Sequence, residues 1–121
     1  MELVKEKTDV NIINAWENRR ILVNEKWHTS NFIISKEKII PNWSCAAIEE
    51  ICIENLSLMA DQDPEIILIG TGKDQILINP EIARFFNQKK IGIEIMNTPS
   101  ACRTYNLLAH ELRKVVAGII I

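Results

Sequence analysis

The sequence is organised around Pro64-Glu65-Ile66-Ile67-Leu68-Ile69-Gly70-Thr71-Gly72, in which an acidic turn leads into an apolar run and then into a loop bracketed by two glycines. Four consecutive branched apolar residues between turn signals are typical of a strand that is buried on both faces. The two glycines allow a sharp turn, and we expect them to leave backbone amides exposed at the carboxyl end of the strand. Open α/β sheets bind their ligands at such strand ends. We therefore predict a central strand over residues 66–69 followed by a candidate ligand-binding loop.

The length and composition are those of one soluble globular domain. The chain has 121 residues, of which 47% are hydrophobic and 25% charged. A formal net charge of -2 gives no basic surface for nucleic acid. The first residues contain no apolar signal segment, and the longest apolar run, residues 115–121, is too short to span a bilayer. We predict a single domain over residues 1–121, with a loose segment at 1–9, in the cytoplasm, with no membrane-spanning helix and no nucleic-acid partner.

The segment after the glycine loop predicts a strand-helix-strand unit. Residues 75–78 are expected to be extended, and Asn79-Pro80-Glu81 has an N-cap residue followed by proline, the usual start of a helix. Ile82, Phe85 and Phe86 then form one apolar stripe at helical spacing. The next strand is expected at Gly92-Ile93-Glu94-Ile95-Met96. Two strands joined by one helix imply a right-handed crossover and therefore a parallel pair.

A second loop is expected to meet the first at one edge of this sheet. Asn97-Thr98-Pro99 is again a cap followed by proline at the first helical position, and it follows the second parallel strand. Amides, threonine hydroxyls and the positive end of a helix should then surround a crevice able to hold a small anion or carboxylate. The candidate ligand-binding residues are Gly70, Thr71, Gly72, Lys73, Thr98 and Arg103. The alternative interpretation is that these residues serve only as turn and capping residues.

The glycine loop does not match the known nucleotide-binding loops. Lys73 is followed by Asp74 instead of serine or threonine, and Gln75 occupies the place of the third glycine of a dinucleotide fingerprint. We therefore predict no nucleotide and no other cofactor.

The N-terminal half is expected to be rich in strands. Residues 10–16 and 20–23 flank a polar Glu17-Asn18-Arg19 turn, which predicts a hairpin, and further short strands follow over residues 27–35. Pro41 restricts the next segment to an edge strand or loop. The tryptophans of this half are interpreted as packing a small sheet onto the rest of the domain, and the alternative is an exposed aromatic patch for a partner. These residues are Trp16, Trp27 and Trp43.

The C-terminal half is completed by two helices and a strand. A short helix is predicted over residues 53–60, where apolar residues recur at helical spacing before the central strand. A longer helix follows Pro99, with Ala101, Tyr105, Leu108 and Leu112 on its apolar face. Residues 115–121 are expected to close the sheet as its last strand.

No catalytic or metal-binding constellation is recognisable. Cys102 and His110 are eight residues apart on one predicted helix, about 12 Å at 1.5 Å per residue, and are too distant to form a nucleophile-base pair. Cys45, Cys52 and Cys102 have no zinc-site spacing, and His28 stands alone, so we predict no metal. A reactive Cys102 thiol at the start of the helix is an alternative to a packed one. The polar stripe of Arg103, Asn106 and His110 is interpreted as a solvated face, and the alternatives are a partner surface or part of the lining of the pocket.

The C-terminal half resembles the conserved domain-of-unknown-function 498 family. The resemblance rests on residues 64–72, on 92–98, and on Ala101-Cys102-Arg103-Thr104-Tyr105-Asn106-Leu107-Leu108 with Glu111 and Arg113. It implies a compact three-layer α/β domain with a mixed central sheet, and it implies no catalytic residues. Eukaryotic members act as chaperone-like assembly proteins of respiratory complex I. The chain departs from the family pattern at Asn97, where aspartate is usual, and at Lys90 and Leu112, where glycine is usual.

The resulting hypothesis is a compact three-layer α/β domain with a parallel β-α-β core. Its predicted function is that of a non-enzymatic protein-binding or assembly factor, linked to assembly of a membrane respiratory complex whose subunits would be its partners. The alternative is a domain that binds a small anion or carboxylate, or an enzyme acting on one, in the crevice between the two loops. A third interpretation is a homo-oligomer formed through an edge strand or through the aromatic N-terminal half. The sequence by itself names no reaction.

Overall fold

The computed structural model describes residues 10–121, so the segment predicted to be loose at 1–9 lies outside the described residues. The strands and helices, in chain order, are β1 (Ile13–Glu17), β2 (Arg20–Val23), β3 (Lys26–His28), β4 (Phe32–Ser35), β5 (Ile39–Pro41), the short 3₁₀ helix η1 (Ile48–Glu50), α2 (Ile53–Ala60), β6 (Ile66–Gly70), α3 (Pro80–Asn87), β7 (Gly92–Met96), α4 (Thr98–His110) and β8 (Val115–Ile119).

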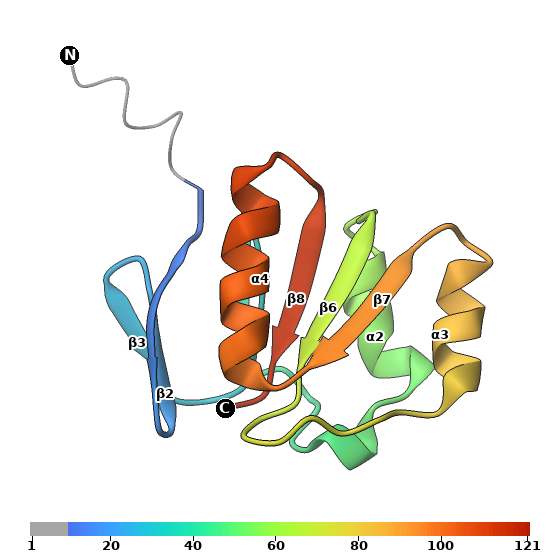
Figure 1. Ribbon diagram of the computed structural model, residues 1–121, viewed down its shortest axis with the longest axis horizontal. Coiled ribbons are helices and arrows are strands. Elements are labelled where there is room, and N and C mark those ends of the chain that lie inside the picture. The colour runs from blue at the N-terminus through green and yellow to red at the C-terminus, as the bar shows by residue number, and fades with distance from the viewer. Residues whose placement is uncertain (1–9) are drawn as a thin grey trace.

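The strands form two sheets (Figure 1). Strands β1, β2 and β3 form an antiparallel meander, which confirms the predicted hairpin, while the other five strands have the order β5-β4-β8-β6-β7. In the larger sheet β6 runs parallel to both β7 and β8, and β4 runs antiparallel to β5 and β8. The predicted mixed sheet with a parallel β-α-β core is therefore confirmed. Residues 75–78 do not form a strand.

The predicted last strand is present as β8, but it lies inside the sheet and not at its edge. β8 lies between β4 and β6, and all five of its residues are buried. Its composition explains this position, because Val115-Val116-Ala117-Gly118-Ile119 contains no polar side chain that needs water. The edges are formed instead by β7 and by β5, which ends in the predicted edge residue Pro41.

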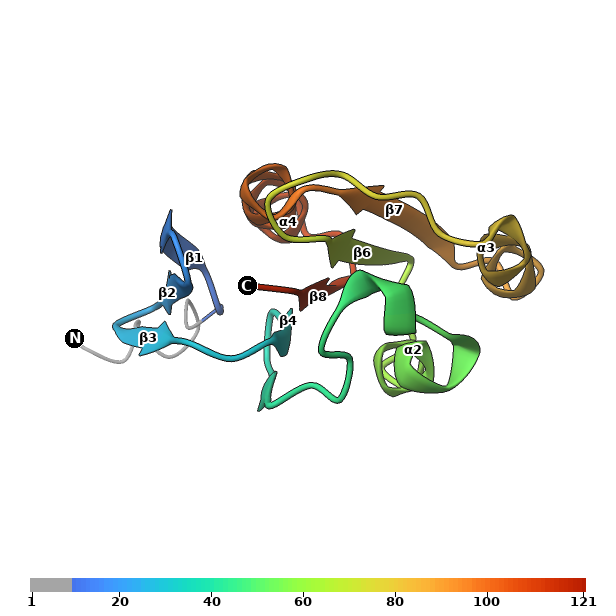
Figure 2. The same cartoon turned by 90° about the horizontal axis from the view of Figure 1, so that it is seen from below.

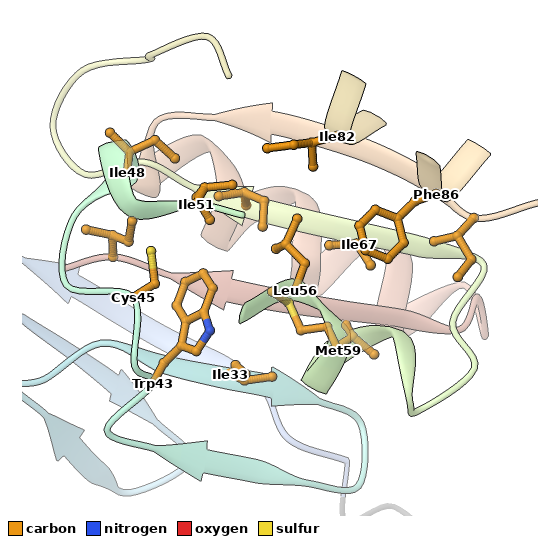
Figure 3. Close-up of a cluster of buried hydrophobic side chains, with 14 residues drawn as sticks. Ile33, Trp43, Cys45, Ile48, Ile51, Leu56, Met59, Ile67, Ile82 and Phe86 are labelled. Carbon is orange, nitrogen blue, oxygen red and sulfur yellow. The ribbon is translucent and has the colours of Figure 1, made fainter. Parts of the chain in front are cut away.

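Two hydrophobic cores lie on opposite faces of the larger sheet. Seen from below, α4 and the small sheet lie on one side and α2 on the other, with α3 beside β7 (Figure 2). The first core contains Trp43, Leu56, Met59, Ile67 and Phe86 (Figure 3). The second joins the small sheet and α4 to the remaining face of the large sheet. These layers confirm the predicted three-layer arrangement.

The tryptophans do not share one role. Trp43 is 5% exposed in the first core, and its indole N–H donates to the Asn55 carbonyl at 3.1 Å. It therefore packs against the large sheet and not the small one. Trp16 is half-buried against the second core, and Trp27 is half-buried with the Arg20 guanidinium 3.8 Å from its ring centroid.

Two apolar residues that were assigned to buried helix faces are exposed. Leu112 is 81% exposed because α4 ends at His110 and Leu112 adopts a positive φ of 66° in the turn beyond it. Phe85 is 36% exposed. Successive helical residues are rotated by about 100°, so Ile82 and Phe86 face the sheet and Phe85 lies at the margin of that face.

Candidate functional site

The two predicted loops do meet at one rim of the large sheet. The parallel register pairs Gly70 of β6 with Met96 of β7, so the turns that follow these residues begin side by side. The Thr98 N–H donates to the Gly72 carbonyl at 2.8 Å, and the Gly72 N–H donates to the Thr98 hydroxyl at 2.8 Å. The loops are therefore joined directly and leave no crevice between these groups.

The hydrogen-bonding groups of this rim are used within the protein. The Thr98 hydroxyl donates to the Ile120 carbonyl at 2.6 Å, and the Thr71 hydroxyl donates to the Asp74 carbonyl at 2.5 Å. The Thr71 N–H donates to the Met96 carbonyl at 2.9 Å. Thr71 and Thr98 are both buried. The prediction of exposed amides at the Gly-Thr-Gly loop is therefore wrong. The Thr71 and Gly72 N–H groups donate to acceptors at the end of β7 and at the start of α4.

The two glycines of the loop have different structural roles. Gly72 has a φ of +97°, a conformation that glycine adopts without strain. Gly70 lies under the first turn of α4, where an added Cβ would come within 3.0 Å of both the Ala101 Cβ and the Thr98 hydroxyl. Gly70 thus permits the close approach of α4 to β6, and only Gly72 makes the turn.

The start of α4 also differs from the prediction in one detail. Asn97 is the N-cap, its side chain accepts a hydrogen bond from the Ser100 N–H at 2.9 Å, and the helix begins at Thr98. Pro99 therefore occupies the second helical position and not the first. At the start of α3 the prediction is confirmed, since the Asn79 side chain accepts from the Glu81 N–H at 2.9 Å and Pro80 is the first residue of the helix.

An open groove lies against this rim, between it and the turn of the β1-β2 hairpin. It is lined by residues 16–19 and Ile21 of the hairpin, by residues 72–73 and 98–99 of the two turns, and by Ile121. Its volume is about 440 Å³. We call it the rim groove.

Three of the predicted ligand-binding residues line the rim groove, namely Gly72, Lys73 and Thr98. Gly70, Thr71 and Arg103 do not line it, and the Arg103 guanidinium carbon lies 5.7 Å from the centroid of the Trp16 ring. The hairpin side of the groove was not foreseen. The structure shows that Arg19 in its turn has a left-handed backbone, a conformation that favours glycine.

The mouth of the rim groove is positively charged. Neither Arg19 nor Lys73 forms an ion pair with another described residue, whereas Glu17 is paired with Arg20 at 2.8 Å. Arg19 and Lys73 are both exposed. The groove thus combines apolar walls with two available cations.

The cysteine and histidine candidates do not form a reactive centre. Cys102 is fully buried, and burial raises the pKa of its thiol to about 12, so the helix start does not activate it. His110 is exposed at the other end of α4. Asn106 does not belong to a free polar stripe, because its side chain accepts from the Ile13 N–H at 3.0 Å and donates to the Ile13 carbonyl at 2.7 Å.

Within residues 10–121, no group of three or more histidine, cysteine or acidic side chains is placed to hold a metal ion. No described helix has the length and apolar character needed to cross a membrane.

Comparison with known proteins identifies the family. Residues 13–120 match the family described as "Protein of unknown function (DUF498/DUF598)", and the chain belongs to this family. The resemblance noted from the sequence is thereby confirmed.

Relatives are known both as sequences and as solved structures. The "NADH dehydrogenase [ubiquinone] 1 alpha subcomplex assembly factor 3" of Xenopus tropicalis is 31% identical over 108 residues, which cover 79% of this chain and 59% of the relative. The "13 kDa major membrane protein" of Francisella tularensis is 41% identical over 73 residues, covering 60% of this chain and 59% of the relative. The chain thus spans somewhat less than two thirds of each. A crystal structure of a Bordetella parapertussis protein is 32% identical with a TM-score of 0.87, covering 93% of this chain and 97% of that one.

Proposed function

We propose that this protein is a non-enzymatic protein-binding factor that acts, from the cytoplasm, in the assembly of a membrane-bound respiratory complex. The observation that carries the proposal is the similarity to relatives named as assembly factors of NADH dehydrogenase, which extends over 79% of this chain in the Xenopus tropicalis protein. Its partners would be subunits or intermediates of such a complex.

The chemistry of the rim supports a binding role over a catalytic one. The hydroxyls of Thr71 and Thr98 donate to backbone carbonyls, and the Cys102 thiol is buried and protonated at neutral pH. A nucleophile needs an accessible group with a neighbouring base. The rim groove offers only Arg19 and Lys73 as charged groups without an ion pair to a described residue, and these are suited to recognition.

The test is affinity purification of the full chain from its native cells, after mild cross-linking, followed by mass spectrometry. We expect respiratory-complex subunits among the captured proteins, and cell fractionation should recover the chain in the cytoplasmic fraction with some of it on membranes. Capture of no respiratory or membrane-complex subunit would contradict the assembly role. A solution mass measurement on the same preparation tests the third interpretation, in which the chain forms a homo-oligomer.

A second candidate function is binding of a small anion or carboxylate in the rim groove. It is favoured by two cations that line the groove, Lys73 from the turn after β6 and Arg19 from the turn of the hairpin. Titration with acetate, succinate and phosphate, followed by amide NMR shifts, tests it. Millimolar or tighter binding with shifts confined to the groove and lost in Lys73→Gln would support it. The Lys38→Gln variant is the matched control, because Lys38 is exposed and lies outside the groove lining.

A further inference from the structure

We propose that the rim groove docks an extended segment of a partner protein in which an apolar side chain neighbours one or two carboxylates. The proposal rests on the proposed function for the existence of a protein partner, and it adds where that partner binds and which chemistry recognises it. A volume of about 440 Å³ falls within the range typical of ligand pockets and suits a few side chains better than a folded domain.

The walls of the groove supply the apolar part of the site. Trp16 and Ile21 come from the hairpin, and Pro99 and Ile121 face them from the rim. Trp16 is only half-buried by the protein itself, with Arg103 near one side of its ring. Partly exposed aromatic side chains in a concave surface are frequent anchors of protein interfaces.

The donors of the two turns that line the groove are not free to recognise a carboxylate. The Gly72 N–H already donates to the Thr98 hydroxyl, and the Thr98 hydroxyl donates to the Ile120 carbonyl. A bound carboxylate would therefore have to be recognised by charged side chains of the lining. The lining residues suited to this are Arg19, from the hairpin turn, and Lys73, from the turn after β6.

The charge at the mouth is opposite in sign to that of the whole chain. The formal net charge is -2, yet the two groove cations form no ion pair with a described residue, and Glu17, the acidic residue of the lining, is paired with Arg20. Complementary charge speeds association and discriminates against partners of the wrong sign. An acidic segment is therefore the partner that this surface selects.

Arg19 gives an independent reason to assign a role to the hairpin turn. It occupies a two-residue turn between the paired residues Glu17 and Arg20, with a φ of 70° at which glycine is the favoured residue. Its side chain makes no hydrogen bond or ion pair to a described residue. The Arg19 side chain therefore contributes no hydrogen bond or ion pair that would stabilise the described fold. Residues in such unfavourable backbone conformations are concentrated at functional sites.

The first test is selection of a random peptide library displayed on phage against the immobilised full chain. We expect the selected peptides to share aspartate or glutamate beside leucine, phenylalanine or another apolar residue. Synthetic versions should bind wild-type protein about tenfold more tightly than Arg19→Gly or Lys73→Gln, and their affinity should fall as salt is raised. Arg19→Lys should retain most of the affinity, and Lys38→Gln, on an exposed site outside the groove lining, should change nothing.

Stability measurements separate binding from folding. Arg19→Gly removes the side chain and relieves the backbone, so its thermal midpoint should equal or exceed that of wild type while its peptide affinity falls. Selection of basic peptides, of none at all, or of peptides that bind the Arg19→Gly/Lys73→Gln double variant equally well would overturn the proposal. Equal occupation of the groove by acetate or succinate would also overturn it, in favour of a small ligand.

Native affinity purification with the double variant distinguishes this inference from the proposed function. If the double variant captures the same respiratory subunits as wild type, the groove is not the docking site and the assembly role stands. If only wild type captures them, both are supported. If neither wild type nor the double variant captures them, the proposed function is contradicted, and the proposed docking site is contradicted with it.

Discussion

The hydroxyl of Thr98 accepts the Gly72 N–H at 2.8 Å and donates to the Ile120 carbonyl at 2.6 Å, so one buried side chain joins the turn after β6, the start of α4 and the segment after β8. Thr98→Val keeps the shape of the side chain but leaves a backbone donor and acceptor without partners. We expect the free energy of unfolding to fall by about 2–4 kcal/mol, measured by urea denaturation.

Thr98→Ser is the control for this change, because serine retains the hydroxyl and loses only a methyl group. Its loss should be about 1 kcal/mol. Equal losses in the valine and serine variants would mean that packing around residue 98, and not its hydrogen bonds, holds the rim together.

The small sheet depends on α4 for its attachment. The Asn106 side chain makes two hydrogen bonds to the backbone of Ile13, and the Tyr105 hydroxyl donates to the Asn11 carbonyl at 2.8 Å. Asn106→Leu should cost about 2 kcal/mol and should accelerate hydrogen exchange of amides in β1 and β2 more than in β6. His110→Leu, one turn further along the same helix and exposed, should change neither. A uniform acceleration in all strands would show that the two sheets unfold as one unit.

The parallel core could be predicted from the sequence because its signals are local. The apolar run at 66–69, the cap-proline pair at Asn79-Pro80 and the strand at 92–96 each point to their own element, and the right-handed crossover rule then joins them. The shared rim followed from that connection. Its confirmation required only that β6 and β7 be adjacent and parallel.

What could not be predicted depends on contacts between distant parts of the chain. The insertion of β8 between β4 and β6 brings residue 34 beside residue 117, and no local pattern specifies this pairing. For the same reason the partners of Thr98, which are 22 and 26 residues away, were invisible, and the rim was expected to have free donors. The hairpin bank of the rim groove was likewise missed, because nothing in residues 16–21 indicates that they fold back toward residues 72 and 98.

The C-terminus of α4 offers a route to greater stability. The backbone N–H of Arg113 donates to the Leu108 carbonyl at 3.1 Å, and that of Leu112 donates to the Ala109 carbonyl at 3.2 Å. This is the hydrogen-bond pattern of a Schellman motif, in which glycine is preferred at the position that Leu112 occupies. Leu112 has a φ of 66° and buries little of its side chain. Leu112→Gly should therefore stabilise the protein by about 0.5–1 kcal/mol, which calorimetry would record as a rise of a few degrees in Tm.

Alanine at the same position is the informative control. It retains the Cβ that disfavours positive φ, so Leu112→Ala should leave Tm nearly unchanged. Lys90 occupies the equivalent position after α3, also with a φ of 66°, and Lys90→Gly should give a similar gain. A gain for alanine as large as that for glycine would assign the effect to removal of an exposed leucine instead of relief of the backbone.

The three cysteines should differ sharply in reactivity. Cys45 and Cys102 are fully buried, and burial raises the pKa of their thiols to about 11 and about 12, whereas Cys52 is partly exposed. An aromatic disulfide reagent at pH 8 should therefore modify one thiol rapidly in the native protein and all three in denaturant. Cys52→Ser should abolish the rapid phase, while Cys102→Ala should leave it unchanged. A second rapid thiol in the native protein would contradict the burial of the other two.

The same pKa shifts predict a loss of stability in alkali. Below pH 9.0, the ordinary pKa of the thiol, both states are protonated and the stability is unaffected. As the pH rises from 9 toward 11 and 12, the unfolded thiols ionise while the buried ones do not, so the unfolded state is favoured and the free energy of unfolding falls. Urea denaturation between pH 8 and 10.5 should show this decline, and Cys102→Ala should make it shallower. A decline of unchanged slope in that variant would mean that other groups, such as Tyr105, whose pKa burial also raises, dominate alkaline unfolding.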